Sequence, residues 1–110
     1  MVADVKPIET MRKKENKKGN KVVLISRTGY TRDKVHILEN LLTERIKLFC
    51  AVGKDCTLWE EIMDELCVGD GSHPVFVLTT SHPGESPEEV IEFAENFSVE
   101  DDLGVRVIEA

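Results

Sequence analysis

Four short apolar segments recur along the chain at nearly constant spacing, and this regularity constrains the fold more than any other feature. The segments begin near residues 21, 47, 74 and 104, so the intervals are 26, 27 and 30 residues. One strand, one helix and two connections fit such an interval. The stretches 31–46 and 86–97 between them carry apolar residues at helical spacing. Repeated strand–helix–strand units predict a parallel sheet with right-handed connections.

The composition of the segments predicts their order in the sheet. Segments 22–26 and 74–80 are the purest apolar runs, which is typical of strands buried on both faces. Segment 105–109 alternates between apolar and polar residues, as an edge strand does. We therefore predict a three-layer α/β/α sandwich of flavodoxin-like type, with a four-stranded parallel sheet in the order 2-1-3-4. The domain spans residues 21–110, and residues 1–20 form a basic, disordered tail with six basic and three acidic residues.

Two of the predicted helices begin with a recognisable capping box. Thr57 and Glu60 match the pattern S/T-x-x-E, and so do Ser86 and Glu89, with Pro87 at the first helical position. Each pattern predicts a helix that begins directly after the serine or threonine.

Charge and cysteine content exclude several classes of protein. The net charge is −7, and an acidic body argues against nucleic acid, which needs a basic face. No apolar run approaches the ~20 residues that span a bilayer, so we expect a soluble, cytoplasmic protein without a membrane partner. The three cysteines lack the C-x-x-C spacing of a zinc site and predict reduced thiols. We predict neither a metal nor a cofactor.

Polar loops follow the first three predicted strands and hold the candidate site residues. In a parallel sheet the carboxyl ends of the strands share one edge, and ligands bind beyond that edge. The candidate anion-binding residues are Ser26, Arg27, Thr28, Gly29, Tyr30, Thr31 and Arg32. The candidate rim of a pocket consists of Asp55, Cys56, Ser81, His82 and Gly84.

The loop S-R-T-G-Y-T, residues 26–31, has two interpretations. Gly29 permits a tight turn, and backbone N–H groups at the start of the following helix favour an anion. Alternatively, Thr31 is an ordinary N-cap and the loop only begins a helix. Both interpretations stay open.

This stretch resembles the phosphate loop of flavodoxins, which reads S/T-x-T-G-x-T, and it lies after the first strand and before the first helix. The resemblance implies a flavodoxin-like fold and a phosphate site. Flavodoxins also place aromatic rings around the flavin, whereas the third loop, T-T-S-H-P-G-E-S, has none. Flavin binding is therefore not expected.

Two phosphate-transferring families are similar in size and architecture. The IIB subunits of cellobiose- and lactose-type sugar phosphotransferase systems end the first strand with a phosphate-accepting cysteine, where this chain has Ser26. Serine lacks the low-pKa thiolate, so phosphocysteine chemistry is not expected. Response-regulator receivers carry an acidic pair and a phosphoacceptor aspartate where this chain has Ser26, Arg27, Thr79 and Thr80. These differences exclude a phosphorelay role. The segment T-T-S-H-P-G-E-S-P-E-E-V-I-E-F-A-E is also similar to short bacterial α/β proteins, which implies no activity.

No complete catalytic set is evident in the sequence. Cys56 and His82, with Asp55 or Glu85 as orienting group, form the best candidate pair. The predicted strand order separates their loops by ~10 Å. We therefore lean against an enzyme and predict a non-catalytic domain that acts through protein–protein contacts. Two edge strands, an acidic surface and a basic arm support self-association or partner docking. The alternatives are binding of a phosphate-bearing small molecule or nucleotide at residues 26–31, and a small enzyme with a site at the carboxyl edge of the sheet.

Overall fold

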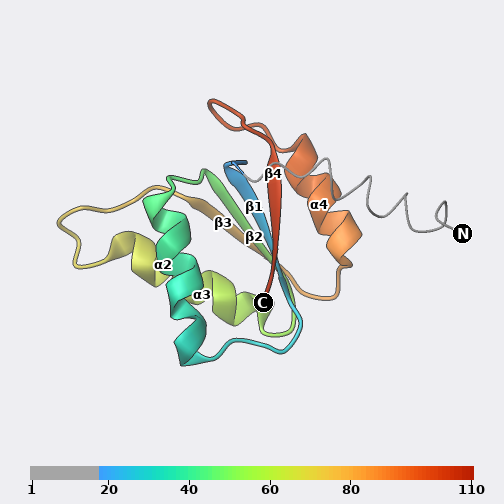
Figure 1. Cartoon of the computed structure of the whole chain (residues 1–110), viewed down its shortest axis with the longest axis horizontal. Helices are drawn as coiled ribbons and strands as arrows, with labels where there is room; N and C mark the ends of the chain where they lie inside the picture. The colour runs from blue at the N-terminus through green and yellow to red at the C-terminus, as the bar shows by residue number, and fades with distance from the viewer. Residues whose placement is uncertain (1–17) are drawn as a thin grey trace, which may run out of the picture.

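A four-stranded parallel sheet forms the centre of the computed structural model, which describes residues 18–110 (Figure 1). β1 (Lys21–Ser26) pairs with β2 (Leu48–Gly53) on one side and with β4 (Val105–Glu109) on the other. β3 (Leu78–His82) pairs with the outer side of β2. The strand order is therefore 3-2-1-4, and the predicted parallel sheet is confirmed. The predicted tail lies mostly outside the described residues.

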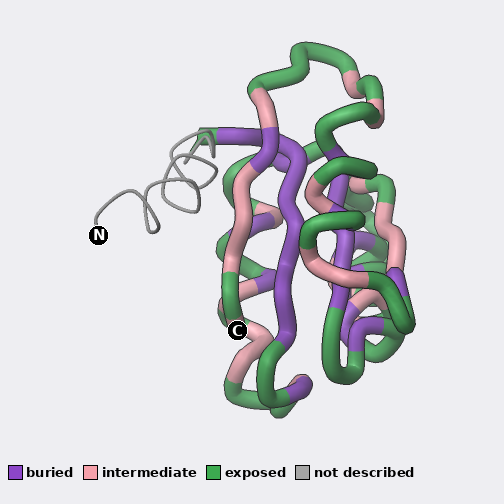
Figure 2. The backbone as a smooth tube through the Cα atoms, turned by 90° about the vertical axis from the view of Figure 1, so that its right-hand side faces the viewer, coloured by how far each residue is buried: buried purple, intermediate pink, exposed green. Residues whose placement is uncertain are grey.

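Helices cover both faces of this sheet (Figure 1). A short 3-10 turn, η1 (Arg32–Lys34), leads into α2 (Val35–Thr43), which lies with α3 (Cys56–Val68) on one face. α4 (Pro87–Asn96) lies on the opposite face and packs across β1, β2 and β4. Figure 2 shows that buried residues follow the central strands between these layers.

Successive residues of β1 and β2 supply two separate cores, because neighbouring side chains of a strand point to opposite faces. Val22 packs on the α3 side with the fully buried Trp59. Val23 packs on the α4 side with Val90. All six residues of β1 are buried, so the strand is the centre of the molecule.

The predicted strand order 2-1-3-4 is wrong, and the reason lies in the segment before β3. Segment 74–80 reads as a central strand, but β3 begins only at Leu78 and continues through polar residues to His82. Phe76 lies outside the strand and is 88% exposed. β2 is buried almost as fully as β1 and takes the central position instead.

One of the two predicted capping boxes is present at the start of its helix. At α4 the Ser86 Oγ accepts a hydrogen bond from the Glu89 N–H at 3.1 Å, and the Glu89 carboxylate accepts from the Ser86 N–H at 2.8 Å. This capping box is confirmed, and its hydrogen bonds lower the pKa of Glu89. The box predicted at Thr57 is wrong, because α3 already begins at Cys56.

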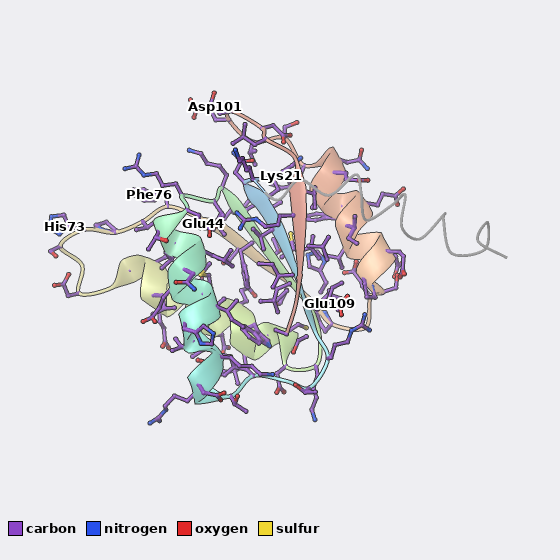
Figure 3. All side chains as sticks on the ribbon, viewed as in Figure 1. Lys21, Glu44, His73, Phe76, Asp101 and Glu109 are labelled. Atoms are coloured by element: carbon purple, nitrogen blue, oxygen red, sulfur yellow. The ribbon has the colours of Figure 1, made fainter. Side chains whose placement is uncertain are left out.

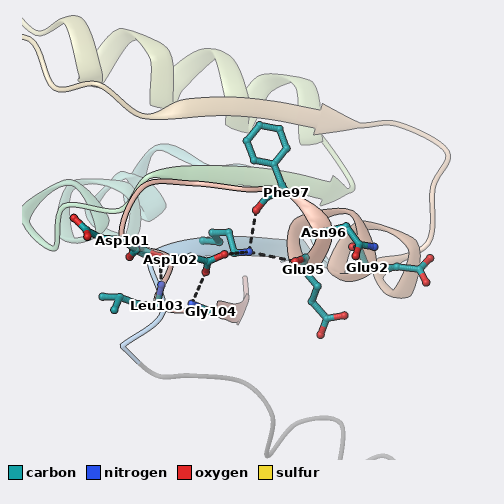
Figure 4. Close-up of polar contacts among 10 residues, drawn as sticks. Glu92, Glu95, Asn96, Phe97, Asp101, Asp102, Leu103 and Gly104 are labelled. Carbon is teal, nitrogen blue, oxygen red and sulfur yellow. Dashed lines mark hydrogen bonds and ion pairs between the residues drawn. The ribbon is translucent and has the colours of Figure 1, made fainter.

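A buried lysine joins β1 to the C-terminal end of α4 (Figure 4). Lys21 is 2% exposed, and its Nζ donates to the carbonyl oxygen of Phe97 at 3.0 Å and to the Asp102 carboxylate at 2.8 Å. The last carbonyls of a helix lack intrahelical donors and favour a cation. The hydrogen bond from Lys21 lowers the pKa of Asp102. This cluster lies at the amino end of the sheet, and its role is to hold α4 against β1.

Candidate functional site

The three loops singled out in the sequence follow β1, β2 and β3, so they share the carboxyl edge of the parallel sheet. Because β2 lies between β1 and β3, the loop after β1 neighbours the loop after β2. The loop after β3 is two strand spacings from the first, about 10 Å. The sheet changes winding direction between β1 and β4, which places residues 26–31 beside the position where ligands bind in such sheets.

The serine and threonine hydroxyl groups of residues 26–31 have partners within the protein. Ser26 is buried, and its Oγ accepts a hydrogen bond from the indole Nε1 of Trp59 at 2.9 Å. The Thr28 Oγ1 accepts from the Lys34 Nζ at 2.8 Å. The Thr31 hydroxyl donates to the Asp33 carboxylate, so its side chain does not cap the backbone of the following turn. These hydrogen bonds within the protein fix the conformation of the loop.

A carboxylate of the protein lies against the backbone of this loop. The Asp55 Oδ2 accepts a hydrogen bond from the Tyr30 N–H at 3.1 Å. A Cβ added to Gly29 would lie 2.4 Å from the same oxygen, so glycine is required for this approach as well as for its φ of +94°. The Tyr30 ring packs edge-on against Trp59, with ring centroids 4.9 Å apart. Asp55 thus occupies part of the space next to the loop that we predicted for an anion.

The basic side chains near the loop point in different directions. The Arg27 N–H donates to the carbonyl of Ala110 at 2.7 Å, and its guanidinium pairs with the Glu109 carboxylate at 3.5 Å, which directs it toward β4. Lys34 turns back into the loop, where its Nζ also donates to the Gly29 carbonyl at 2.8 Å. Arg32 is exposed on η1. The Lys34 ammonium thus hydrogen-bonds to the loop from outside the predicted anion-binding range, residues 26–32.

The structure does not bring Cys56 and His82 together. Cys56, the first residue of α3, is buried in the core with Trp59. His82 pairs in register with Val52 and lies on the opposite, α4-facing side of the sheet, where its ring contacts Phe93 at a centroid distance of 4.9 Å. β2, which precedes Cys56, and β3, which ends at His82, are neighbours, contrary to the predicted order. The sheet nevertheless separates the two side chains, because they lie on opposite faces.

His82 is held in a fixed orientation by its surroundings. Its Nε2 is 2.8 Å from the Thr80 Oγ1, and its Nδ1 is 3.0 Å from the Glu85 Oε2. Ser81 precedes it on the α3-facing side, paired with Ala51. Gly84 has a φ of +79° in the turn that leads to α4. The predicted rim residues therefore divide between the two faces of the sheet.

The cysteines are free, buried thiols, as predicted: Cys50, Cys56 and Cys67. Burial raises the pKa of Cys50 to about 11 and also raises the pKa of Cys67. Such thiols are poor nucleophiles, because the thiolate is the reactive form. Within residues 18–110, no cluster of three or more His, Cys, Asp or Glu side chains has the arrangement of a metal site. None of the helices in this described part is both long and apolar enough for a membrane span.

A second candidate surface lies at the outer edge of β3. No residue in the described range pairs with this edge. Phe76, on the connection between α3 and β3 (Figure 3), is 88% exposed, and Leu78 in β3 is 49% exposed. Phe93 of α4 is also partly exposed and contacts His82 at the end of the strand. We call the outer backbone of β3 together with Phe76, Leu78 and Phe93 the β3 edge surface.

The fold and these surfaces define the chain as a small α/β domain with an all-parallel four-stranded sheet. It belongs to the family described as "Domain of unknown function (DUF7684)", whose model matches residues 2–107. No curated protein and no solved structure matches the chain.

Proposed function

We propose that this domain is non-catalytic and acts through protein–protein contacts made by the β3 edge surface. The observation that carries the proposal is an unpaired, uncharged edge strand beside exposed apolar side chains. An unpaired strand presents a row of backbone donors and acceptors that another chain can bind. A side chain as exposed as Phe76 contributes little to folding, whereas aromatic residues are enriched at protein interfaces.

The two edges of the sheet differ in their protection. β4 carries Arg106, which pairs with Glu44, and Glu109, which pairs with Arg27. Charged side chains of this kind are a common protection of edge strands against pairing. β3 has the sequence Leu-Thr-Thr-Ser-His and contains no lysine, arginine, aspartate or glutamate. The contrast supports β3 as the edge that takes a partner.

A photo-crosslinking experiment tests this proposal. We expect p-benzoylphenylalanine at position 76, in the full chain expressed in its source organism, to form covalent adducts with a protein after irradiation. The matched control is the same substitution at Leu58, which is 40% exposed near the start of α3, at the other end of the sheet. Equal adduct formation at both positions, or none at position 76, would contradict the proposal.

We also propose a cytoplasmic location in a bacterial cell. The support is the set of three free thiols, because unpaired cysteines are typical of a reducing compartment. The acidic balance of the chain, −7 overall, agrees with a surface kept soluble by charge.

Binding of a phosphate-bearing small molecule or nucleotide at residues 26–31 is the second candidate function. The position of Lys34, whose Nζ lies 2.8 Å from both the Thr28 Oγ1 and the Gly29 carbonyl, supports it. The Asp55 carboxylate opposes it, because it already accepts the Tyr30 N–H.

Titration with inorganic phosphate, FMN and sugar phosphates tests the anion site. If the loop binds anions, the amide resonances of Gly29 and Thr31 shift at millimolar ligand, and Asp55→Asn strengthens the shift because it removes a like charge. Arg106→Gln is the control: it removes a cation of β4 whose guanidinium contacts Glu44 and the Gly19 carbonyl, and it leaves the titration unchanged. Unshifted Gly29 and Thr31 amides in both the unmodified chain and Asp55→Asn would end the anion proposal.

A further inference from the structure

We infer that the partner of the β3 edge surface is a second copy of this chain, paired antiparallel through β3 to form a continuous eight-stranded sheet. The inference rests on the proposed function and adds the identity of the partner. It follows from the direction of the free backbone groups of β3, from the symmetry of their spacing and from the side chains next to them.

The pairing with β2 determines which backbone groups of β3 face outward. The Leu78 N–H donates to the Lys47 carbonyl at 3.1 Å, so the N–H and C=O of Leu78 point toward β2. Successive residues of a strand alternate in this direction. The backbone groups of Thr80 therefore also point toward β2, and those of Thr79 and Ser81 point toward the open edge.

These outward groups are complementary to themselves. When two copies of β3 meet antiparallel about Thr80, Thr79 of each copy lies opposite Ser81 of the other. Each such pair exchanges two backbone hydrogen bonds. Thr80 then faces Thr80 of the second copy as a non-hydrogen-bonded pair, and cross-strand threonine pairs stabilise a sheet. The outward backbone groups of Thr79 and Ser81 thus all gain hydrogen-bond partners, without any insertion or bulge.

The α4-facing side of β3 explains why pairing also removes apolar surface from water. α4 packs across β1, β2 and β4, which leaves Leu78 half exposed on this side. In the antiparallel pair, Leu78 lies opposite His82 of the second copy. The Phe93 side chain, which contacts His82 in its own chain, borders the same region. Pairing therefore covers Leu78 and extends the apolar surface across the junction.

Acidic side chains on the α3-facing side oppose this association and give it a characteristic salt dependence. The Thr79 hydroxyl donates to the Asp64 carboxylate at 2.5 Å and lies 3.4 Å from a Glu60 carboxylate oxygen. In the pair, these carboxylates approach those of the second copy across the junction. Salt screens such repulsion, so we expect the dimer to become more stable as ionic strength rises. A basic peptide on the same edge would show the opposite dependence.

Disulfide trapping tests both the partner and the register. Thr80→Cys places two thiols at a non-hydrogen-bonded pair with Cα atoms about 4.5 Å apart, within the range of a disulfide. We expect mild oxidation of this full-chain variant to yield several-fold more linked dimer than Thr79→Cys. The Thr79 positions of the two copies are about 8 Å apart in this register, beyond that range. The native cysteines are buried and do not compete.

Two further measurements complete the test. A mixture of Thr79→Cys and Ser81→Cys chains should link mainly to each other, because these positions are opposite in the pair. Sedimentation of the unmodified chain should show a dimer fraction that increases with NaCl concentration. Equal linking of all cysteine variants, a monomer at every salt concentration, or a dimer weakened by salt would overturn the inference. If position 76 still crosslinks to a different protein, the proposed function stands and only self-pairing fails.

Discussion

Replacement of Trp59 by alanine is expected to lower the free energy of unfolding by about 3–5 kcal/mol. Trp59 is fully buried between α3 and the sheet. Its indole N–H donates to the buried Ser26 Oγ, and its ring packs against Tyr30. The substitution leaves a large cavity, removes the donor from a buried hydroxyl and withdraws the support from two residues of the loop after β1. The stability of the core and the shape of the candidate anion loop therefore depend on the same side chain.

Urea unfolding followed by circular dichroism measures this effect. Fluorescence is not suitable, because Trp59 is the single tryptophan of the chain. Leu58→Ala is the matched control: it removes a neighbouring apolar side chain that is partly exposed, and it should cost less than about 1 kcal/mol. Ser26→Ala separates the hydrogen bond from the packing and should cost about 1–3 kcal/mol, because the indole N–H loses its acceptor. If Trp59→Ala lowered the free energy of unfolding by less than Leu58→Ala does, Trp59 would not anchor the core.

Replacement of Gly53 by alanine is expected to cost on the order of 3 kcal/mol or more. Gly53 ends β2 with a φ of +98°, which L-residues rarely adopt. A Cβ at this position would lie 2.3 Å from the carbonyl oxygen of Ser26, its neighbour in the sheet. That same oxygen accepts the Lys54 N–H at 3.0 Å. The obstruction is backbone rather than a flexible side chain, so β1 and β2 must separate at the carboxyl edge.

Gly71→Ala provides a matched control for this prediction. Gly71 also has a positive φ, +88°, but no atom lies within 4 Å of an added Cβ. It therefore reports the backbone strain alone, about 1–2 kcal/mol, and the additional loss in Gly53→Ala measures the contact with Ser26. Chemical unfolding of both variants gives the comparison. Equal losses in the two variants would show that β1 and β2 adapt to the added methyl group without cost.

Much of the secondary structure was predictable because it depends on local chemistry. The Ser86–Glu89 capping box needs only residues three positions apart, and it is present at the start of α4. The failure at Thr57 is also local. Asp55, with a φ of 59°, takes the N-cap position, so α3 begins before the threonine. The pattern S/T-x-x-E identified the helix correctly and its first residue wrongly.

The strand order was not predictable from composition, because burial depends on what packs around a strand. The run Pro-Val-Phe-Val reads as a central strand, yet Phe76 is exposed and β3 itself is mostly polar. β2 follows the charged Lys47 and ends in Gly53, yet it is buried between two neighbouring strands. The same apolar residue types occur before an edge strand and within a central strand, so composition does not distinguish the two.

The candidate site was also predictable only in part. The sequence identified the loop at residues 26–31 and its neighbour Asp55, because both follow strands whose carboxyl ends share an edge. It did not reveal that the Asp55 carboxylate lies against Tyr30 and Gly29, or that Lys34 and Trp59 hold the loop. The predicted strand order places the loops of Cys56 and His82 about 10 Å apart. In the structure the sheet separates them, because the Cys56 side chain lies on the α3 side and the His82 side chain on the α4 side.

The amino-acid pattern predicted the number of strands, their parallel direction, the helices between them and the edge on which the polar loops lie. These features follow from periodicity and spacing, which act over a few residues. Only the folded structure reveals which strands are central, which face each side chain takes and which edge stays open. Those outcomes depend on contacts between residues distant in the chain, since the same apolar segment is stable in the core or at an interface according to what covers it.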